Sequence, residues 1–439
     1  MDKNEYLKGL SEDQRSAFDF LLSGSNVFLT GSAGTGKSFL IDRFIQYSRS
    51  KGKNILVTAY TGIAAQNIGG ATLNRTFSLD FAPKTYMPST EDIPPVLRST
   101  DILIIDEISV VRIDMFDYIT ALIHLSETTF KKKIQLILVG DFYQLPPVIS
   151  SKDLALLESY YSNKIGKGFA FRSANWAAFG IRTIKLKQVI RQTDADFAKA
   201  LDYIRTGDIR GNSWIKAHSA SDPIPNAFSL VSKKDETVSI NQKFLSSLDP
   251  ASEHIYYMQK CGDVNDDDIR ADETLILRKG AVVMVLENDH SGRDMYVNGS
   301  YGTVTELFEN SVNVKLNSGI VNFARYTWDS YEYEESNDPE QNAPCARIVG
   351  QHSQIPLKLA WAISIHKSQG QTYDKLNVDL SGTWEDGHVY TALSRIRDIR
   401  NLYIHGIIPT DAVHASDEVK HFYADTENNA GSLRGPCCI

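Results

Sequence analysis

Residues 31 to 38 read Gly31-Ser32-Ala33-Gly34-Thr35-Gly36-Lys37-Ser38. The apolar run Val27-Phe28-Leu29 precedes this stretch, and a second apolar stretch begins after it at Phe39. This order predicts a strand, a glycine-rich loop and a helix, which together direct backbone N–H groups and the positive end of the helix at one point. The glycines are needed because side chains would block the approach of phosphate oxygens. The stretch therefore predicts a nucleoside triphosphate site.

The loop residues have distinct expected roles. Lys37 is expected to reach the β- and γ-phosphates, and the hydroxyl of Ser38 is expected to bind Mg²⁺. By average composition, the fixed positions of this pattern arise by chance in about one or two of every hundred chains of this length. The prediction therefore depends on the rest of an ATPase being found downstream. The nucleotide-binding residues predicted from the loop are Gly31, Ser32, Ala33, Gly34, Thr35, Gly36, Lys37 and Ser38.

Two further segments supply the chemistry that such a loop requires. The apolar run 102–105 is followed by Asp106 and Glu107, at the end of a predicted buried strand. Asp106 is expected to hold Mg²⁺ through water, and Glu107 to polarise the attacking water. The next predicted strand ends in residues 140–147, where Gln144 is expected to sense the γ-phosphate. In the same segment Phe142, Tyr143 and Pro146 are expected to form a platform on which nucleic-acid bases stack.

Composition sets the broad class of the protein. The 439 residues are 42% hydrophobic, enough for two to four domains at about 100–200 residues each. Apolar runs are of strand length, well short of the roughly 20 residues that span a bilayer, so no membrane segment is expected. The N-terminus lacks the pattern of a secretory signal, which predicts an intracellular, soluble protein. The net charge of −8 requires that any nucleic-acid partner be held by a local basic groove.

The distribution of apolar runs predicts the fold. Apolar strands alternate with amphipathic helices through the first 150 residues, which indicates a parallel sheet covered on both faces. A second block with the same alternation begins near Arg182, where residues 183–186 read as its first strand. Short strands separated by turn residues follow from residue 281, typical of a small antiparallel module.

At this point the residues resemble a known family. Residues 31–38, 106–107, 140–148, 186–192 and 387–395 together resemble a superfamily-1 DNA helicase of the petite-integration-frequency (PIF) group, a relative of the RecD helicases. The resemblance spans residues of about 10 to 405. It implies an α/β fold with two RecA-like parallel-sheet P-loop domains and a small β-barrel-like insertion in the second. The implied boundaries are 1–181 for the first domain, with a small insertion at about 77–99; 182–300 and 355–424 for the second; 301–354 for the β-barrel-like insertion; and 425–439 for a flexible tail.

The resemblance also implies site residues. Arg191 and Arg395 match arginines that reach the ATP from the second domain, so that hydrolysis is coupled to domain motion. Gln14 matches a glutamine that reads adenine, and Gly370 lies in a motif that links ATP to DNA. The implied DNA contacts are Thr61, Gly62, Thr72, Asn74, His366, Lys367 and Ser368, with Asn74 standing where family members generally carry His.

The expected function follows from this resemblance. It implies an ATP-dependent DNA helicase that uses ATP and Mg²⁺, translocates 5′ to 3′ on single-stranded DNA as a monomer, and unwinds duplex DNA, G-quadruplexes and RNA–DNA hybrids. The associated processes are DNA repair, DNA recombination and telomere maintenance. The expected location is intracellular, in the cytoplasm or nucleoid, and the nucleus and the mitochondrion stay open as alternatives.

Two alternatives stay open on the residues alone. A P-loop nucleotide-binding switch or phosphotransferase would need neither Arg191 nor Arg395, and a DNA-binding remnant would bind DNA without turnover. ATPase activity measured with and without single-stranded DNA separates all three.

Overall fold

The computed structural model describes residues 3–61, 64–65, 68–79, 82–162, 164–192, 194–225, 227–264, 269, 271–287, 289, 295–334 and 345–432. The chain divides into two compact units. The first unit contains residues 1–232 and 364–439, and the second contains residues 233–363. Among the described residues, no helix combines the length and the apolar character needed to cross a bilayer.

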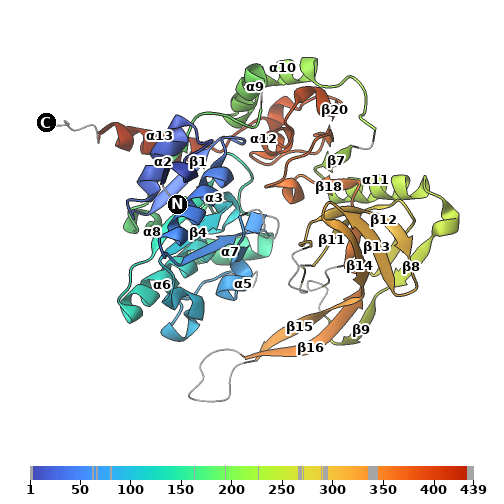
Figure 1. Ribbon diagram of the computed structural model, residues 1–439, viewed down its shortest axis with the longest axis horizontal. Coiled ribbons are helices and arrows are strands. Elements are labelled where there is room, and N and C mark those ends of the chain that lie inside the picture. Colours follow the sequence, from blue (N-terminus) through green and yellow to red (C-terminus); the bar gives the residue numbers. More distant parts are fainter. Residues whose placement is uncertain are drawn as a thin grey trace. The chain divides into compact units, whose positions relative to one another are not determined.

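The centre of the first unit is a six-stranded parallel sheet with the order β3-β2-β4-β5-β1-β6 (Figure 1). The central strands β1 and β4 are buried along their whole length, as expected for a parallel sheet covered on both faces. The strands are β1 (Val27–Gly31), β2 (Ile55–Ala59), β3 (Ala71–Thr72), β4 (Ile102–Asp106), β5 (Gln135–Gly140) and β6 (Arg182–Leu186).

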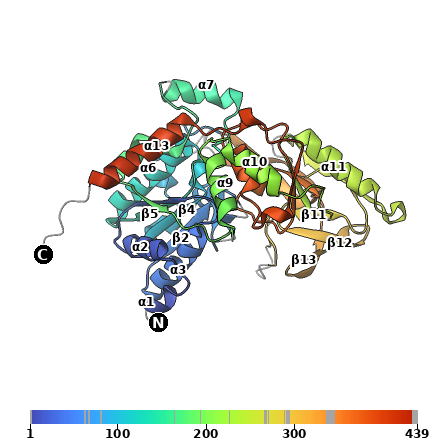
Figure 2. The ribbon, with the colours of Figure 1, turned by 90° about the horizontal axis from the view of Figure 1, so that it is seen from above.

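Helices cover both faces of this sheet, which Figure 2 shows between two groups of helices. Successive residues of a strand point to opposite faces, so Phe28 joins the core under α6 and α13, whereas Leu29 joins the core under α2 and α3. The α-helices of this unit are α1 (Lys3–Tyr6), α2 (Glu12–Leu21), α3 (Lys37–Ser50), α5 (Leu73–Phe77), α6 (Ile113–Phe130), α7 (Ser151–Tyr160), α8 (Ala174–Ala178), α9 (Ala195–Arg205), α10 (Arg210–His218), α12 (His388–Leu393) and α13 (Asp417–Ser432).

A second parallel sheet in the first unit contains β7 (Phe228–Val231), β19 (Leu376–Asp379) and β20 (Leu402–His405). Strand β18 (Ala362–Ser364) spans the boundary between the two units. The short 3-10 helices of the first unit are η1 (Thr90–Asp92), η2 (Pro95–Arg98), η3 (Ile108–Val110), η4 (Ala170–Arg172), η7 (His366–Ser368), η8 (Ile399–Asn401) and η9 (Thr410–Ala412).

The predicted α/β fold with parallel sheets is confirmed, but two of its elements differ from the prediction. Residues 183–186, expected to begin the second sheet, lie in β6, which pairs with β1 in the first sheet. The pattern of apolar residues identifies a strand but does not say which strand it pairs with. Here the partner of β6 is β1, about 150 residues earlier in the chain. Residues 425–432, expected in a flexible tail, continue helix α13.

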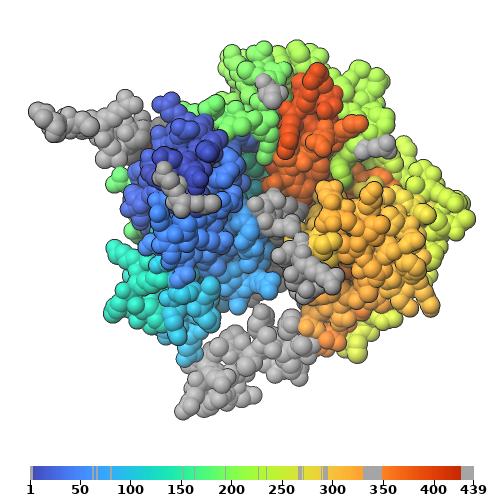
Figure 3. All heavy atoms as spheres, in the orientation of Figure 1, coloured from blue at the N-terminus to red at the C-terminus, as the bar shows by residue number. Residues whose placement is uncertain are grey.

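The second unit is built mainly of antiparallel strands. Its largest sheet has the order β14-β13-β12-β11-β17, and smaller sheets pair β15-β16-β9 and β10-β8. Figure 3 shows the yellow and orange atoms of these strands gathered in one body. The elements are α11 (Lys234–Ser246), η5 (Pro250–Ser252), β8 (His254–Tyr257), β9 (Gln259–Gly262), β10 (Thr274–Leu277), β11 (Val282–Val285), β12 (Tyr301–Leu307), β13 (Ser311–Leu316), β14 (Gly319–Ala324), β15 (Tyr326–Glu334), β16 (Cys345–Gln354) and β17 (Leu357–Leu359).

The β-barrel-like form expected for this region is not what the described residues show. The five-stranded sheet has two edges, at β14 and β17, and is therefore open rather than closed. The antiparallel pairing also begins well before residue 301, because β8 to β11 already take part in it. The apolar sides of these strands pack into a single core of their own.

Candidate functional site

A cleft of about 420 Å³ opens at the carboxyl ends of β1, β4 and β5. Ligands of open parallel sheets bind at this edge, because the loops that leave the strands converge there. The cleft brings together residues from the glycine-rich loop after β1, from the ends of β4 and β5, and from the segments after β6, η7 and α12. Its lining residues are Ala33, Gly34, Gly36, Lys37, Ser38, Phe39, Asp106, Glu107, Gly140, Gln144, Ile190, Arg191, Gly370, Thr372, Arg395 and Arg397.

The glycine-rich loop is held open by its backbone conformation and by close neighbours. Gly34 has φ +87°, a left-handed value that favours glycine. A Cβ built on Gly34 would lie 2.6 Å from the Cβ of Arg191 and 2.6 Å from Oε1 of Gln192. The Gly34 carbonyl accepts hydrogen bonds from the backbone N–H groups of Ile190 and Arg191. The loop therefore has no room for a side chain where it meets the segment that carries Arg191.

Lys37 begins helix α3 and lies against its own loop. Its Nζ donates to the Gly31 carbonyl at 2.8 Å and to the Ser32 carbonyl at 3.2 Å. Burial lowers the pKa of Lys37, while the carboxylates of Asp141 and Glu107 oppose that shift. The ammonium is thus already placed where the loop N–H groups would bind phosphate.

Two adjacent carboxylates, the buried Asp106 and the half-buried Glu107, lie at the end of β4. Burial, together with the Glu107 carboxylate, raises the pKa of Asp106 to about 7. The backbone N–H of Glu107 donates to Oδ1 of Asp106 at 2.8 Å, and Glu107 itself has φ +54°. Two carboxylates this close repel each other in a low-dielectric site, and a bound dication would relieve the repulsion. The residues present therefore fit the predicted Mg²⁺ site of Asp106 and Ser38.

Gln144 presents an unsatisfied polar atom beside this pair. Its Oε1 is buried and lacks a hydrogen-bond partner among the described residues. Leaving such an atom unpaired is costly, which is consistent with a ligand group or water in the cleft. Glu107 is held on its other side by Gln369, whose Nε2 donates to Oε2 of Glu107 at 3.1 Å and to Oγ of Ser109 at 3.3 Å. We did not identify Gln369 from the sequence, although it precedes the predicted Gly370.

Two predicted arginines face the loop, with a third that we missed. The guanidinium of Arg191 donates to the Ser394 carbonyl at 3.2 Å, and burial together with Arg395 lowers the pKa of Arg191 to about 10. Arg395 is only 2% exposed and donates to the Thr391 carbonyl at 2.8 Å. Arg397 also lines the cleft, and its spacing two residues after Arg395 is the signal that could have identified it. This concentration of positive charge suits a triphosphate.

Gln14 lies close to the glycine-rich loop. The side chain is fully buried, and its Nε2 donates to the Thr35 carbonyl at 3.0 Å. Its Oε1 accepts from the backbone N–H of Ser11 at 3.0 Å, which completes a capping box at the start of α2. Gln14 therefore holds the loop and caps a helix in this structure, and its contact with adenine stays a prediction.

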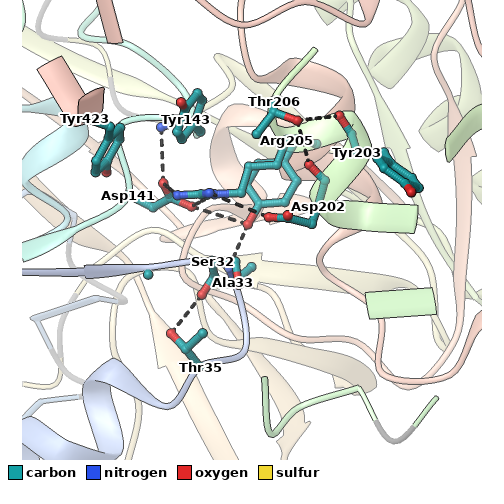
Figure 4. A network of polar contacts seen from close by, with 12 residues as sticks. Ser32, Ala33, Thr35, Asp141, Tyr143, Asp202, Tyr203, Arg205, Thr206 and Tyr423 are labelled. Carbon is teal, nitrogen blue, oxygen red and sulfur yellow. Dashed lines mark hydrogen bonds and ion pairs between the residues drawn. The ribbon is translucent and has the colours of Figure 1, made fainter. Parts of the chain in front are cut away.

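A polar network that we did not predict lies behind the loop (Figure 4). Asp141, after β5, accepts two hydrogen bonds of 2.9 Å from Arg205 of α9. The hydroxyl of Tyr390 in α12 donates to Asp141 at 3.3 Å and accepts from the backbone N–H of Ala33 at 2.6 Å. This network thus connects the glycine-rich loop to α9 and α12. In the sequence, only the position of Asp141 directly before the predicted platform hints at this network. The partners of Asp141, Arg205 and Tyr390, lie far along the chain.

The predicted base-stacking platform is wrong for Phe142 and Pro146. Phe142 is 1% exposed. Its ring packs against aromatic neighbours at centroid distances between 4.8 and 5.8 Å, which leaves no face free for a base. Pro146 is buried as well. The half-buried ring of Tyr143 stacks on Tyr423 at 5.0 Å and lies 4.4 Å from the guanidinium of Arg205. The aromatic neighbours of Phe142 are Phe28, Phe169, Phe171, Trp176 and Phe422.

Phe142→Leu tests this correction. Because the ring fills a well-packed core, we expect the smaller side chain to lower the free energy of unfolding by about 1 kcal/mol. DNA affinity should stay unchanged, because the ring offers no face to a base. Denaturant unfolding and DNA titration measure the two effects. A loss of DNA affinity with unchanged stability would restore the stacking role.

The other predicted DNA contacts have different environments. The hydroxyl of Thr72 accepts from the backbone N–H of Arg75 at 3.3 Å, and the hydroxyl of Thr61 accepts from that of Ala64 at 3.2 Å. The side-chain amide of Asn74 donates to the Leu79 carbonyl at 3.1 Å. Gly62 lies outside the described residues. The roles of these residues in DNA binding stay predictions.

The segment around His366 presents only part of its predicted contact surface. Lys367 is exposed and the side chain of His366 is 38% exposed, so both are accessible. Ser368 is fully buried, and its hydroxyl donates to the Ile365 carbonyl at 2.7 Å. The predicted phosphate contact of the Ser368 side chain is therefore wrong for this conformation.

Comparison with known proteins agrees with the site. Residues 9–213 match the family model of the PIF1-like helicase. The chain is 33% identical over 446 residues to the ATP-dependent DNA helicase Pif1 of Bdellovibrio bacteriovorus, covering 95% of this chain and 92% of that protein. It is 35% identical to ATP-dependent DNA helicase PIF1 of Danio rerio, covering 94% of this chain and 63% of that longer protein.

Solved structures give the same result. The crystal structure of Bacteroides Pif1 bound to single-stranded DNA matches with a TM-score of 0.82 and 30% identity, covering 96% of this chain and 98% of that one. The Bacteroides Pif1 structure in complex with ADP-AlF3 and single-stranded DNA matches with a TM-score of 0.80 and 31% identity, covering 97% and 98%. Because these matches extend over nearly the whole chain and the predicted motif residues meet in one cleft, the chain belongs to the PIF1-like helicase family.

Proposed function

We propose that this chain uses ATP hydrolysis to move along single-stranded DNA in the 5′-to-3′ direction and to separate the duplex ahead of it. As a member of its family, the chain is an ATP-dependent DNA helicase. Direction, a monomeric working state, and activity on G-quadruplexes and RNA–DNA hybrids are parts of the proposal that rest on the family resemblance.

One observation carries the proposal: a single cleft holds the glycine-rich loop and both predicted arginines. In the proposed mechanism, Lys37 and the arginines stabilise charge on the transferring phosphate oxygens, and Glu107 polarises the attacking water molecule. Ser38 and Asp106 would hold Mg²⁺, which would neutralise charge on the β- and γ-phosphates. Arg395 reaches the cleft from the segment after α12, outside the six-stranded sheet that carries the glycine-rich loop, which suits a motor that couples hydrolysis to movement.

The cleft also has direct connections to the segments that would move. Gly387 has φ +74°, and a Cβ there would lie 2.5 Å from the Gln144 carbonyl, so α12 begins in close contact with the loop after β5. Gln369 links Glu107 to the segment that carries His366 and Lys367. Changes at the phosphates would therefore reach the predicted DNA contacts through packed groups.

The energetics permit small steps. Opening one base-pair step costs on the order of 1.4 kcal/mol, which one ATP hydrolysis supplies. A step of one nucleotide per ATP is therefore sufficient for unwinding.

Unwinding of matched partial duplexes tests the proposal. We expect a duplex with a 5′ single-stranded overhang to open when ATP and Mg²⁺ are present, and the same duplex with a 3′ overhang to stay closed. A blunt duplex and a non-hydrolysable ATP analogue serve as controls. Opening of the 3′-tailed substrate alone would contradict the direction, and opening of neither would contradict helicase activity.

A further inference from the structure

Three side chains able to bind a transition metal lie together near the start of α12. They are His366 of η7, Glu385 in the loop before α12, and His388, the first residue of α12. One nitrogen or oxygen atom from each lies within 4.8 Å of those of the other two. None of the three lines the nucleotide cleft, so they form a cluster separate from the predicted Mg²⁺ site.

The separations within this cluster are those of metal ligands. Nε2 of His388 lies 3.4 Å from Oε2 of Glu385 and 3.5 Å from Nδ1 of His366. Nε2 of His366 lies 3.1 Å from the same oxygen of Glu385. With Zn–N and Zn–O distances of about 2.0–2.1 Å, the ligand atoms of a tetrahedral site stand about 3.3 Å apart. His366 would use only one of its two ring nitrogens, and with one atom from each residue the three ligand atoms lie within 4.8 Å of one another. Side-chain rotation would bring them to the spacing of a single cation's ligands.

The atoms that face one another in this cluster share few hydrogens. His388 is 3% exposed and turns its Nε2 to the other two side chains. Its Nε2 faces a carboxylate oxygen and another imidazole nitrogen, yet a neutral imidazole carries a single N–H proton. A cation would accept lone pairs from all three side chains at once.

We propose that His366, Glu385 and His388 form a binding site for a transition-metal dication of the Zn²⁺ type. Two imidazoles and one carboxylate favour such ions over Mg²⁺, which prefers oxygen ligands in octahedral geometry. The side chain of His366 is 38% exposed, which leaves solvent access for a water molecule as the fourth ligand.

The surroundings support the loop that carries Glu385. The adjacent Asp386 is paired with both Lys167 and His414, which fixes the loop that carries Glu385. A bound cation would tie this loop and α12, which leads to Arg395, to the segment of His366. Metal binding should therefore raise the thermal stability of the protein.

Zn²⁺ binding to the full chain without an affinity tag tests the site. Its cysteines should first be alkylated, because Cys437 and Cys438 at the C-terminus could hold zinc independently. Competition with a chromophoric chelator should give one equivalent of bound Zn²⁺ that millimolar Mg²⁺ does not displace. Glu385→Gln and His388→Gln should each weaken Zn²⁺ binding by about 10-fold or more. His405→Gln, the same change at an exposed histidine, should leave it unchanged.

Two further measurements keep the result decisive. Co²⁺ should give the visible absorption of a tetrahedral complex in the wild type, and a zinc-soaked crystal should show anomalous scattering between the three side chains. Unchanged zinc affinity in both variants, or anomalous scattering elsewhere only, would overturn the proposal. Thermal melts without metal verify that the variants fold. Because neither DNA nor ATP enters these experiments, their outcome is independent of the proposed function.

Discussion

Lys37→Ala is expected to reduce DNA-stimulated ATP hydrolysis by about 100-fold or more, a loss typical of removing a group that stabilises charge in the transition state. In this structure Nζ of Lys37 donates hydrogen bonds to two carbonyl groups of the loop, those of Gly31 and Ser32. These bonds can be exchanged for phosphate oxygens when a nucleotide enters. Binding of single-stranded DNA should be largely retained, because Lys37 lines the nucleotide cleft. Steady-state ATPase assays with and without DNA measure the effect.

Lys51→Ala is the matched control. Lys51 caps the other end of the same helix, α3, and is exposed over the ring of Tyr47. The same change of residue type there should leave hydrolysis within about twofold of the wild type, because surface substitutions of this kind have small effects. Stimulated turnover close to wild type in Lys37→Ala would contradict the assignment of the cleft as the hydrolytic site.

Arg205→Met is expected to lower the free energy of unfolding of the protein by about 3–5 kcal/mol, the cost of leaving a buried charge without its counter-ion. Arg205 and Asp141 are 4% and 1% exposed and share two hydrogen bonds of 2.9 Å. Burial tends to raise the pKa of Asp141, but Arg205 outweighs burial and the net shift is downward. The pair therefore contributes stability above about pH 4, the ordinary carboxylate value, and loses it as the pH falls through the lowered pKa.

Equilibrium unfolding in denaturant, at neutral pH, measures this effect. Arg210→Met is the control, because Arg210 pairs with Asp208 at the surface, where solvent screens an ion pair and its loss has little effect on stability. The double variant Asp141→Asn/Arg205→Met should recover part of the loss, since no unpaired charge remains. An Arg205→Met protein as stable as Arg210→Met would show that the pair does not hold the two sides of the network together.

The cleft was largely predictable because its chemistry is local. A glycine-rich loop between an apolar strand and a helix has few conformations. Asp106 and Glu107 come at the end of an apolar run, and such a run indicates a buried strand. In a parallel sheet such strand ends meet at one edge, which places Lys37 and Glu107 together. Arg191 and Arg395 came from resemblance alone, since an isolated arginine carries no pattern of its own.

Burial of individual side chains was not predictable in the same way. The sequence predicts an exposed platform at Phe142, but Phe422 of α13 covers the ring, and the hydroxyl of Tyr423 accepts a hydrogen bond from the backbone N–H of Phe142. The resemblance implies a phosphate contact for Ser368, but the hydroxyl donates to the Ile365 carbonyl within η7. The contacts of Phe142 join residues far apart in the chain, which a short sequence window does not contain. The Ser368 bond is local, but it depends on a 3-10 turn that the sequence analysis did not predict.

The sequence by itself determined where the glycine-rich loop lies, which strands are buried, and to which family the chain is similar. These follow from short-range patterns, in which the period of apolar residues and the spacing of glycines fix local structure. Tertiary structure alone decided that β6 joins the first sheet, that Asp141 pairs with Arg205, and that His366, Glu385 and His388 meet. The physical reason is that these contacts join segments far apart in the chain, and only the packed fold selects among the partners that each pattern permits.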